Sequence, residues 1–451
     1  MNKKIWIKSP LAILAENADN GIVIQGSKIV ELVPKGALPM SAFDEIYDAA
    51  ESVVLPGLIN THHHFYQTLT RAHPDALNKE LFPWLTSLYK VWTHLDETMI
   101  YHSTKLALTE LLLSGCTTAS DHHYVFSENL ENAIDIQVEV ARELGMRVVL
   151  TRGSMSLGQD DGGLPPQSVV QDEQRILDDS TRLINTYHET HQGAMTQIAL
   201  APCSPFSVST ELMIESAKIA KENKLCLHTH LAETIDEENF CLKKFGMRTV
   251  DYLEHVGWLH DRTWLAHGIH FNDEEIQRLG AAKVGIAHCP TSNMMLASGI
   301  CKTLELEKQG AIIGIGVDGS ASNDGSNMIT EVRMAMYLQR LKYGSSKITH
   351  QKAFEWATKG SAQILRRDDI GEIAVGKEAD LALFKLDELR FSGSHDPLAA
   401  LLLCGATKAD RVMIAGKWKV IDGEVLEMDI KQLMLQHSAQ AKKLYTAALN
   451  N

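Results

Sequence analysis

The sequence predicts a closed parallel (β/α)8 barrel, an α/β fold of the TIM type, joined to a smaller second domain. Three observations support this prediction. The 451 residues exceed an ordinary single domain. Short apolar segments with the composition of strands alternate with longer amphipathic segments, and the polar residues of interest follow the strands. Barrels of this size are common, and their crossover connections are right-handed.

Eight short apolar segments, several of them bounded by Gly or Pro, are candidate strands. They span residues 53–64, 117–121, 147–152, 197–203, 225–230, 263–267, 284–289 and 312–318. Segments between them carry apolar residues at three- and four-residue steps, as amphipathic helices do. These include residues 99–114, 130–144, 210–224 and 327–343. The first fifty residues instead have the pattern of short strands separated by turns.

Composition limits the class of partner. Hydrophobic residues make up 45% of the chain and charged residues 22%, as is typical of a globular protein. The net charge of −14 disfavours binding to nucleic acid or to an anionic membrane, and favours a neutral or weakly charged small molecule. Seven cysteines without a CxxC pair indicate reduced thiols in a cytoplasmic protein. No signal peptide or membrane-spanning segment is evident in the sequence.

Nearly all the reactive side chains lie where a predicted strand ends. They are His62 and His64, Asp121, Cys203, His230, His267, His288 with Cys289, and Asp318. In barrel enzymes the carboxyl ends of the strands form the catalytic face. The sequence therefore predicts one active site at that face.

The first barrel strand ends in three consecutive histidines. Because alternate side chains of a strand share a face, His62 and His64 point the same way. An exposed histidine tract or a tag remnant is the alternative, but neither is expected after an apolar strand. With His230 and Asp318, these histidines could bind a catalytic zinc or iron ion that keeps one position open for water.

A carboxylate lies close to the predicted metal site. Glu233, three residues beyond His230, could reach the water there and act first as general base and then as general acid. His228 shares a face with His230, so it is either a further ligand or, as we favour, a packing or hydrogen-bonding neighbour. His267 could also bind the metal, although we favour a role in polarising the substrate and orienting the water.

These motifs resemble those of the amidohydrolase superfamily over almost the whole chain. The resemblance implies a small β-sandwich built from both chain ends, which we map onto residues 1–55 and, with a terminal helix, 366–451. The barrel then spans residues 56–365. The matching landmarks are the opening signature at 55–64, His230 with Glu233, His267, Asp318 and the segment 371–381.

The end of the fourth strand narrows the chemistry that the resemblance implies. It reads Leu200-Ala201-Pro202-Cys203, without the lysine that is carboxylated in binuclear relatives. A single divalent metal is therefore expected, Zn²⁺ with Fe²⁺ as the alternative, in the mononuclear branch of nucleobase deaminases. In that branch Asp318 binds metal and helps to deprotonate water, while Glu233 passes a proton to the ring before ammonia leaves. Amide or lactam hydrolysis is disfavoured.

The resemblance also suggests a substrate. The motif His62-x-His64-x-x-Gln67 is similar to that of guanine deaminases and chlorotriazine hydrolases, in which the Gln amide contacts the ring; a turn-capping role is the alternative. Guanine deaminases carry an Arg before a Phe-Ser pair, and here Pro205 precedes Phe206. The chain looks most similar to the 8-oxoguanine deaminases, which implies conversion of 8-oxoguanine to urate and ammonia.

Other functions remain open from the sequence. The same metal site would serve a deaminase or hydrolase of isocytosine, guanine, cytosine, an adenosine-like nucleoside or an aminotriazine. A catalytically inactive barrel that only binds ligands is a hypothesis from a different class. It predicts lost metal ligands, and none of the expected ligands is missing.

The ring pocket is predicted from aromatic and strand-end residues. Residues 82–92 are rich in aromatics and either cover a flat ring or form the apolar stripe of a helix; we expect Tyr89 and Trp92 to contact the ring. Cys203 is expected at the substrate edge distant from the metal, with a buried small-residue role as the alternative. His123 is a further candidate for the pocket wall.

Residues 356–366 and 429–448 are expected to form helices after the barrel. The second of these is amphipathic, and it either packs on the barrel or forms a contact between subunits. We expect a homo-oligomer.

Overall fold

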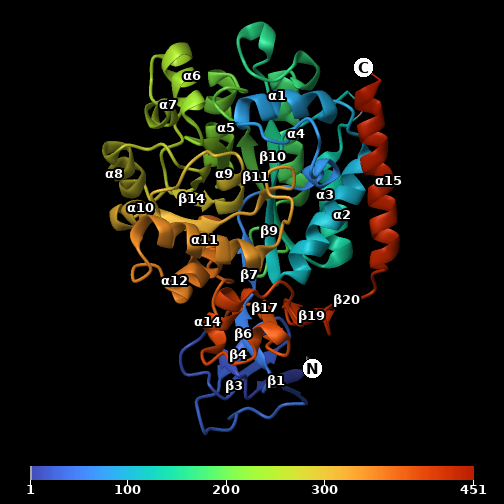
Figure 1. Cartoon of the computed structure of the whole chain (residues 1–451), viewed down its shortest axis with the longest axis vertical. Helices are drawn as coiled ribbons and strands as arrows, with labels where there is room; N and C mark the ends of the chain where they lie inside the picture. Colours follow the sequence, from blue (N-terminus) through green and yellow to red (C-terminus); the bar gives the residue numbers. More distant parts are fainter. Residues whose placement is uncertain (1–2, 129, 451) are drawn as a thin grey trace.

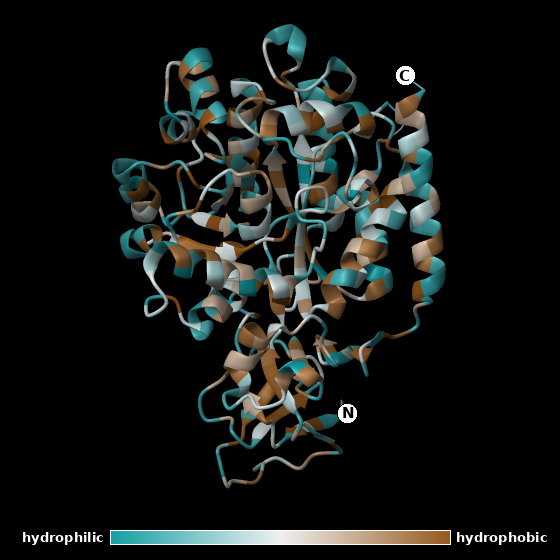
Figure 2. Ribbon diagram, viewed as in Figure 1, coloured by the Kyte–Doolittle hydropathy of each residue, from teal (hydrophilic) through white to brown (hydrophobic). Residues whose placement is uncertain are grey.

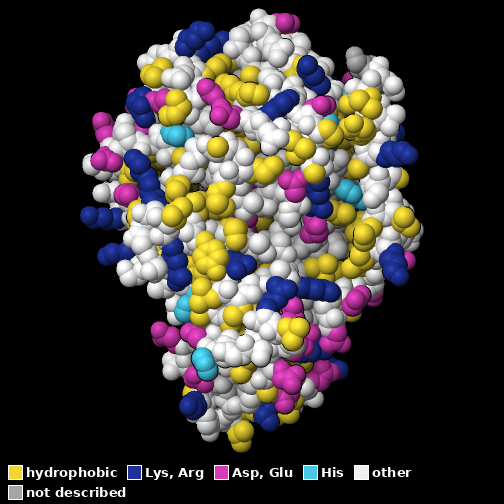
Figure 3. Space-filling view, in the orientation of Figure 1, with side chains coloured by type: hydrophobic (Ala, Val, Ile, Leu, Met, Phe, Trp, Pro, Cys, Tyr) yellow, Lys and Arg dark blue, Asp and Glu magenta, His cyan; other side chains and the backbone are white. Residues whose placement is uncertain are grey.

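A computed structural model describes residues 3–128 and 130–450. Figure 1 shows a barrel with its surrounding helices above a smaller β-rich part that contains the N-terminus. The long C-terminal helix lies along one side of the barrel. Apolar residues concentrate in the strands of both parts (Figure 2), whereas acidic and basic side chains are interspersed on the face seen in Figure 3.

The barrel is an eight-stranded parallel sheet in which each strand pairs with its neighbours along the chain. Its strands are β7 (Leu58–Asn60), β9 (Cys116–His123), β10 (Arg147–Ser154), β11 (Thr196–Pro202), β12 (Leu227–Leu231), β13 (Thr263–His267), β14 (Gly285–His288) and β15 (Ile312–Ile315). The backbone N–H of Thr61 donates to the carbonyl of Ile315 at 2.9 Å and closes the ring. Beyond this bond β16 (Asp318–Gly319) pairs with β8 (His63–His64). The predicted barrel is confirmed.

Helices cover the outside of the barrel and the carboxyl ends of its strands. They are α1 (Leu81–Trp92), α2 (Glu97–Leu113), α3 (Ala133–Leu144), α4 (Glu173–Tyr187), α5 (Thr210–Asn223), α6 (Ile235–Phe245), α7 (Thr249–His255), α8 (Asp273–Ala281), α9 (Pro290–Met295), α10 (Thr303–Gln309), α11 (Met328–Tyr343) and α12 (His350–Glu355). Side chains such as Asp96, Ser209 and Asn327 accept a hydrogen bond from the first turn of the helix that follows each of them. These N-caps explain where the predicted helices begin.

Strands from both chain ends form the smaller part. One sheet contains β4 (Lys28–Leu32), β3 (Gly21–Gln25), β1 (Lys4–Lys8) and β5 (Glu45–Asp48). The other contains β2 (Ala12–Ile13), β6 (Ser52–Pro56), β17 (Leu381–Lys385), β18 (Arg411–Ile414), β19 (Lys417–Ile421) and β20 (Glu424–Val425). Buried aliphatic residues such as Ile22, Val54 and Leu381 pack together in this part.

The chain passes from the smaller part into the barrel at Gly57. A Cβ atom at this position would lie 2.1 Å from Oγ1 of Thr117, so only glycine allows the close approach of β9. The first histidines of the site therefore follow a segment that both parts of the fold hold in place. The domain boundaries expected at residues 55 and 365 stay predictions.

After α12 the chain forms a π-helical turn (Trp356–Gly360) and α13 (Ser361–Ile364), and later α14 (Pro397–Ala400) and a second π-helical turn (Leu401–Gly405). The terminal helix α15 (Ile430–Leu449) packs against α2 and a 3-10 turn, η1 (Phe65–Thr70). Of the two roles expected for this helix, packing on the barrel is therefore observed. Homo-oligomerisation stays a prediction. None of the helices in the described residues has the length and apolarity needed to cross a bilayer.

Candidate metal centre and active site

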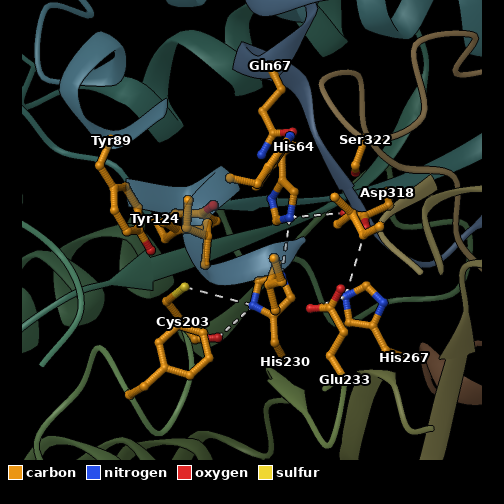
Figure 4. Close-up of a pocket in the computed structure, with 15 residues that line it drawn as sticks. His64, Gln67, Tyr89, Tyr124, Cys203, His230, Glu233, His267, Asp318 and Ser322 are labelled. Carbon is orange, nitrogen blue, oxygen red and sulfur yellow. Dashed lines mark hydrogen bonds and ion pairs between the residues drawn. The ribbon is translucent and has the colours of Figure 1, made fainter. Parts of the chain in front are cut away.

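Four residues from distant parts of the chain converge at the carboxyl ends of the barrel strands, and Figure 4 shows three of them, His64, His230 and Asp318. The Nε2 atoms of His62 and His64 each lie 3.2 Å from Oδ1 of Asp318. The Nε2 atom of His230 lies 3.2 Å from the Nε2 atom of His64. The structure thus brings together the four side chains expected to bind the metal.

The hydrogen bonds of His64 and His230 define which ring nitrogen carries the proton. Nδ1 of His64 lies 2.7 Å from the carbonyl oxygen of His122, and Nδ1 of His230 lies 2.7 Å from that of Cys203. A carbonyl oxygen can only accept, so both Nδ1 atoms donate. Each neutral ring then presents a lone pair on Nε2.

A second histidine sets the tautomer of His62. Nδ1 of His228 donates to the carbonyl oxygen of Trp264 at 2.9 Å, so its Nε2 is an acceptor. That Nε2 accepts from Nδ1 of His62 at 2.8 Å. His62 therefore also presents a lone pair on Nε2, and His228 has the outer-shell position that commonly orients a ligating histidine.

This arrangement fits a divalent cation. Burial lowers the pKa of His62 and His230 well below the ordinary value, so both rings are neutral. No described residue hydrogen-bonds Nε2 of His62, although the atom is buried. Facing lone pairs about 3 Å apart repel unless a cation lies between them. Three imidazole nitrogens and a carboxylate oxygen form a donor set that zinc or iron accepts.

Two other histidines have ligand atoms near this group. A nitrogen of His122 lies within 4.8 Å of the ligand atoms of His62, His64 and His230, and a nitrogen of His267 lies within 4.8 Å of those of His62 and Asp318. However, Nε2 of His122 bonds the carbonyl oxygen of Ala201 at 2.8 Å, and its own carbonyl anchors His64. Nε2 of His122 is therefore engaged by the protein, whereas its buried Nδ1 has no hydrogen-bond partner among the described residues.

The backbone of the site is strained where strands end. His267 and Asp318 have φ values of 72° and 64°, and Ala232, just before Glu233, has a φ of 53°. Left-handed backbone is costly for residues other than glycine. The chain turns sharply just after β12, at the end of β13 and at the start of β16, and these turns bring Glu233, His267 and Asp318 close together.

Glu233 and His267 lie side by side next to the predicted ligands (Figure 4). Oε2 of Glu233 is 3.4 Å from Nε2 of His267, and Nε2 of His267 is 3.9 Å from Oδ2 of Asp318. Burial raises the pKa of Glu233, which makes its carboxylate a better proton acceptor than an exposed one. Oε1 and Oε2 of Glu237 accept from the backbone N–H groups of Ala232 and Glu233 at 2.9 and 3.0 Å and hold this turn.

A cavity opens beside these groups. Its polar lining consists of His64, Gln67, Tyr89, Tyr124, Cys203, His230, Glu233, His267, Asp318 and Ser322. Its apolar lining consists of Leu81, Trp84, Leu85, Phe206 and Leu296. The aromatic and aliphatic walls suit a flat ring, and the polar groups suit its heteroatoms.

Of the residues expected to bind the substrate, Gln67, Tyr89 and Cys203 line this cavity. Trp92 does not, and this corrects our expectation. The cavity ends at Tyr89, and Trp92 lies nearly one helical turn further along α1. There it is fully buried, and its Nε1–H donates to Oγ1 of Thr70 at 3.3 Å.

His123 is also absent from the cavity lining, which is a second correction. Side chains of β9 alternate between the two faces of the barrel sheet. His122 faces the barrel interior, so His123 faces outward, where its ring packs edge-on against Tyr66 and Phe126.

The sequence interpretation missed several lining residues. Tyr124 has the same parity as His122, so strand alternation could have identified it. Phe206 and Ser322 lie on loops after β11 and β16, and Leu296 follows α9. No local pattern in the sequence distinguishes these three from other loop residues.

A family model described as the amidohydrolase family matches residues 53–419. The chain belongs to the amidohydrolase family. This amidohydrolase is 62% identical over 98% of its length to an 8-oxoguanine deaminase from Pseudomonas aeruginosa, 99% of which is covered. It is 33% identical to an isoxanthopterin deaminase from an unknown prokaryotic organism, over 88% of this chain and 87% of that protein. The predicted family is confirmed.

A solved structure supports both the fold and the metal. An atrazine chlorohydrolase from Arthrobacter aurescens, in complex with zinc, superposes on this amidohydrolase with a TM-score of 0.90 and 29% identity. The match covers 98% of this chain and 99% of that one. The family and the His/Asp group together support a divalent metal in this amidohydrolase.

Proposed function

We propose that this amidohydrolase is a zinc-dependent deaminase that converts 8-oxoguanine and water to urate and ammonia. The observation that carries the proposal is the 62% identity to an 8-oxoguanine deaminase across nearly the whole of both chains. The cavity supports it, because aromatic and aliphatic walls face a few polar groups beside the predicted metal ligands, as recognition of a flat heterocycle requires.

We propose that His62, His64, His230 and Asp318 hold the metal. Zinc is favoured because these donors match its preference and because the structurally similar chlorohydrolase binds zinc. Fe²⁺ accepts the same donors and is the alternative. When bound, the ion would lower the pKa of water from about 15.7 toward about 7 and so make hydroxide available at neutral pH.

Glu233 is the proposed proton carrier. Its Oε2 faces His267 beside the predicted ligands, and its raised pKa allows it to accept a proton from the attacking water. Glu233 then delivers this proton to the ring nitrogen next to the carbon under attack. The water oxygen bonds to that carbon as a hydroxyl group. Glu233 then takes the remaining proton from this hydroxyl and passes it to the exocyclic nitrogen, so the C–N bond breaks, ammonia leaves and a ring carbonyl remains. His267 orients the water and polarises the substrate.

The remaining lining groups are proposed to recognise the ring. No described residue hydrogen-bonds Oε1 of Gln67 or the hydroxyl of Tyr89, although both atoms are buried. Unpaired buried polar groups are costly, so these two atoms are available for a polar ligand. Burial raises the pKa of Cys203 to about 12, so its thiol is neutral. The lining residues include no Lys or Arg, which suits a neutral oxopurine.

A panel assay of ammonia release tests this function. Purified protein loaded with zinc would be compared on 8-oxoguanine, guanine, isocytosine, cytosine and an aminotriazine. We expect the highest kcat/KM with 8-oxoguanine, loss of activity after removal of metal with a chelator, and recovery after zinc is restored. If 8-oxoguanine is inert while another ring turns over, the substrate assignment is wrong.

A further inference from the structure

We propose that Asn293 and Ser298 are positioning residues that orient the two proton-handling side chains, His267 and Glu233, and that they act as one hydrogen-bonded unit. Both lie in the segment after β14, within α9 and just beyond it. The inference rests on the proposed deaminase function, and it explains how a histidine and a glutamate on different strands keep a fixed relative geometry.

Asn293 holds the ring of His267. It is fully buried, and its Oδ1 accepts from Nδ1 of His267 at 2.9 Å. The backbone N–H of Asn293 donates to the carbonyl of Cys289 at 3.0 Å, which anchors the amide on α9. Because the backbone of His267 is left-handed and strained, the direction of its side chain depends on such a partner. The bond at Nδ1 leaves Nε2 of His267 directed at Glu233.

Ser298 holds one oxygen of the Glu233 carboxylate. Its side chain is buried, and its Oγ donates to Oε1 of Glu233 at 3.3 Å. The terminal torsion of a glutamate is soft, so without this donor the two oxygens could exchange places. With Oε1 bonded to Ser298, Oε2 remains the oxygen that faces His267. The geometry therefore assigns proton transfer to Oε2.

The two residues are linked directly. The backbone N–H of Ser298 donates to the carbonyl oxygen of Asn293 at 2.9 Å. The carbonyl of Ser298 in turn accepts from Nε2 of His270 at 2.8 Å, three residues beyond His267. A displacement of either residue should therefore be transmitted to the other. Leu296, between them, lines the cavity, so the same segment also contacts the ring.

Alanine variants separate positioning from a purely structural role. We expect Asn293→Ala and Ser298→Ala each to lower kcat by about 10–100-fold, a part of the 10²–10⁴ that acid–base catalysis supplies. KM should change by less than about threefold, because neither side chain belongs to the cavity lining. The solvent deuterium isotope effect on kcat should rise as proton transfer becomes rate-limiting. Metal content per chain should stay unchanged.

Three further variants complete the design. Ser298→Thr keeps the hydroxyl and should recover kcat to within about threefold of the wild type. The double alanine variant should lose less than the product of the two single losses, because linked residues are not additive. Met294→Ala is the matched control: the side chain lies on the same helix, is 45% exposed and makes none of these bonds.

The inference and the proposed function fail in different ways. If the wild type deaminates another ring rather than 8-oxoguanine, the substrate is wrong, and the variants are then tested on that ring. If the wild type is active and both alanine variants keep kcat within about twofold, the inference is overturned. It is also overturned if the loss appears only in KM or in metal content. Crystal structures of the variants give a readout independent of activity, because we expect the Nε2–Oε2 distance between His267 and Glu233 to lengthen, and an unchanged distance contradicts the proposal.

Discussion

Nε2 of His437, on the terminal helix α15, lies 3.0 Å from Oγ1 of Thr68, on the turn that carries Gln67. The hydroxyl of Thr68 donates to the carbonyl of Phe65, so the histidine nitrogen is the donor in this bond. The last helix of the chain is therefore tied to the turn η1, one residue from the cavity lining.

This contact predicts a stability effect. His437→Ala removes a buried hydrogen bond and leaves space beneath α15, so the free energy of unfolding should fall by about 1–3 kcal/mol. Urea denaturation at neutral pH measures it. Gln436→Ala is the control, because that neighbouring side chain is exposed. Equal stability of the two variants would show that the contact does not stabilise the fold.

The same histidine predicts a pH dependence. Burial, with the nearby charges of Arg71 and His102, lowers the pKa of His437 from 6.5 to about 4. The unfolded chain therefore binds the proton at a higher pH than the folded chain does, and stability is lost as the pH falls from about 6.5 to about 4. The stability difference between the wild type and His437→Gln should shift against the wild type by roughly 2–3 kcal/mol between pH 7 and pH 4. A constant difference would contradict the assignment.

His228 should tune metal affinity without binding the metal. His228→Ala removes the acceptor for Nδ1 of His62, and we expect metal affinity to fall by about 10–100-fold while the stoichiometry at saturation stays at one. Competition with a chelator and elemental analysis measure the two quantities. His191→Ala, at an exposed position, is the control. Complete loss of metal at saturating zinc would instead identify His228 as a ligand.

Glu233→Gln should separate metal binding from proton transfer. The amide cannot accept the proton of the attacking water, so kcat should fall by about 10²–10⁴-fold while the metal remains bound. Steady-state kinetics and metal analysis on one preparation provide the test, with the exposed Glu222→Gln as control. Normal turnover in the Glu233 variant would remove this residue from the mechanism.

Substitutions at Tyr89 and Trp92 should affect different properties, substrate binding at Tyr89 and stability at Trp92. Tyr89→Phe removes an unpaired hydroxyl from the cavity, so KM for the ring should rise by about 3–10-fold. Trp92→Phe should lower the melting temperature and leave KM unchanged, because this ring packs against Tyr66 outside the cavity. A rise in KM for the Trp92 variant alone would show that Trp92, and not Tyr89, contacts the ring.

Much of the site was predictable because its signals are local. Strands have a two-residue period, so the sequence indicates that His62 and His64 share a face. Reactive residues at the ends of successive strands indicate a common catalytic face, since parallel strands in a barrel all end on the same side. The spacing from His230 to Glu233 similarly indicates a carboxylate beside the metal.

Other features depend on contacts between remote segments. Aromatic composition indicates that α1 could cover a ring. Only the folded structure shows that Trp92 packs against η1, through Tyr66 and Thr70, and that the cavity ends at Tyr89. The role of His228 depends on the position of the Trp264 carbonyl. The roles of Asn293 and Ser298 depend on the segment after β14 lying against His267 and Glu233. Periodicity and strand order are properties of neighbouring residues and can be read from the chain. The partner of a buried hydrogen bond is decided by the folded structure, because its donor and acceptor can be separated by hundreds of residues.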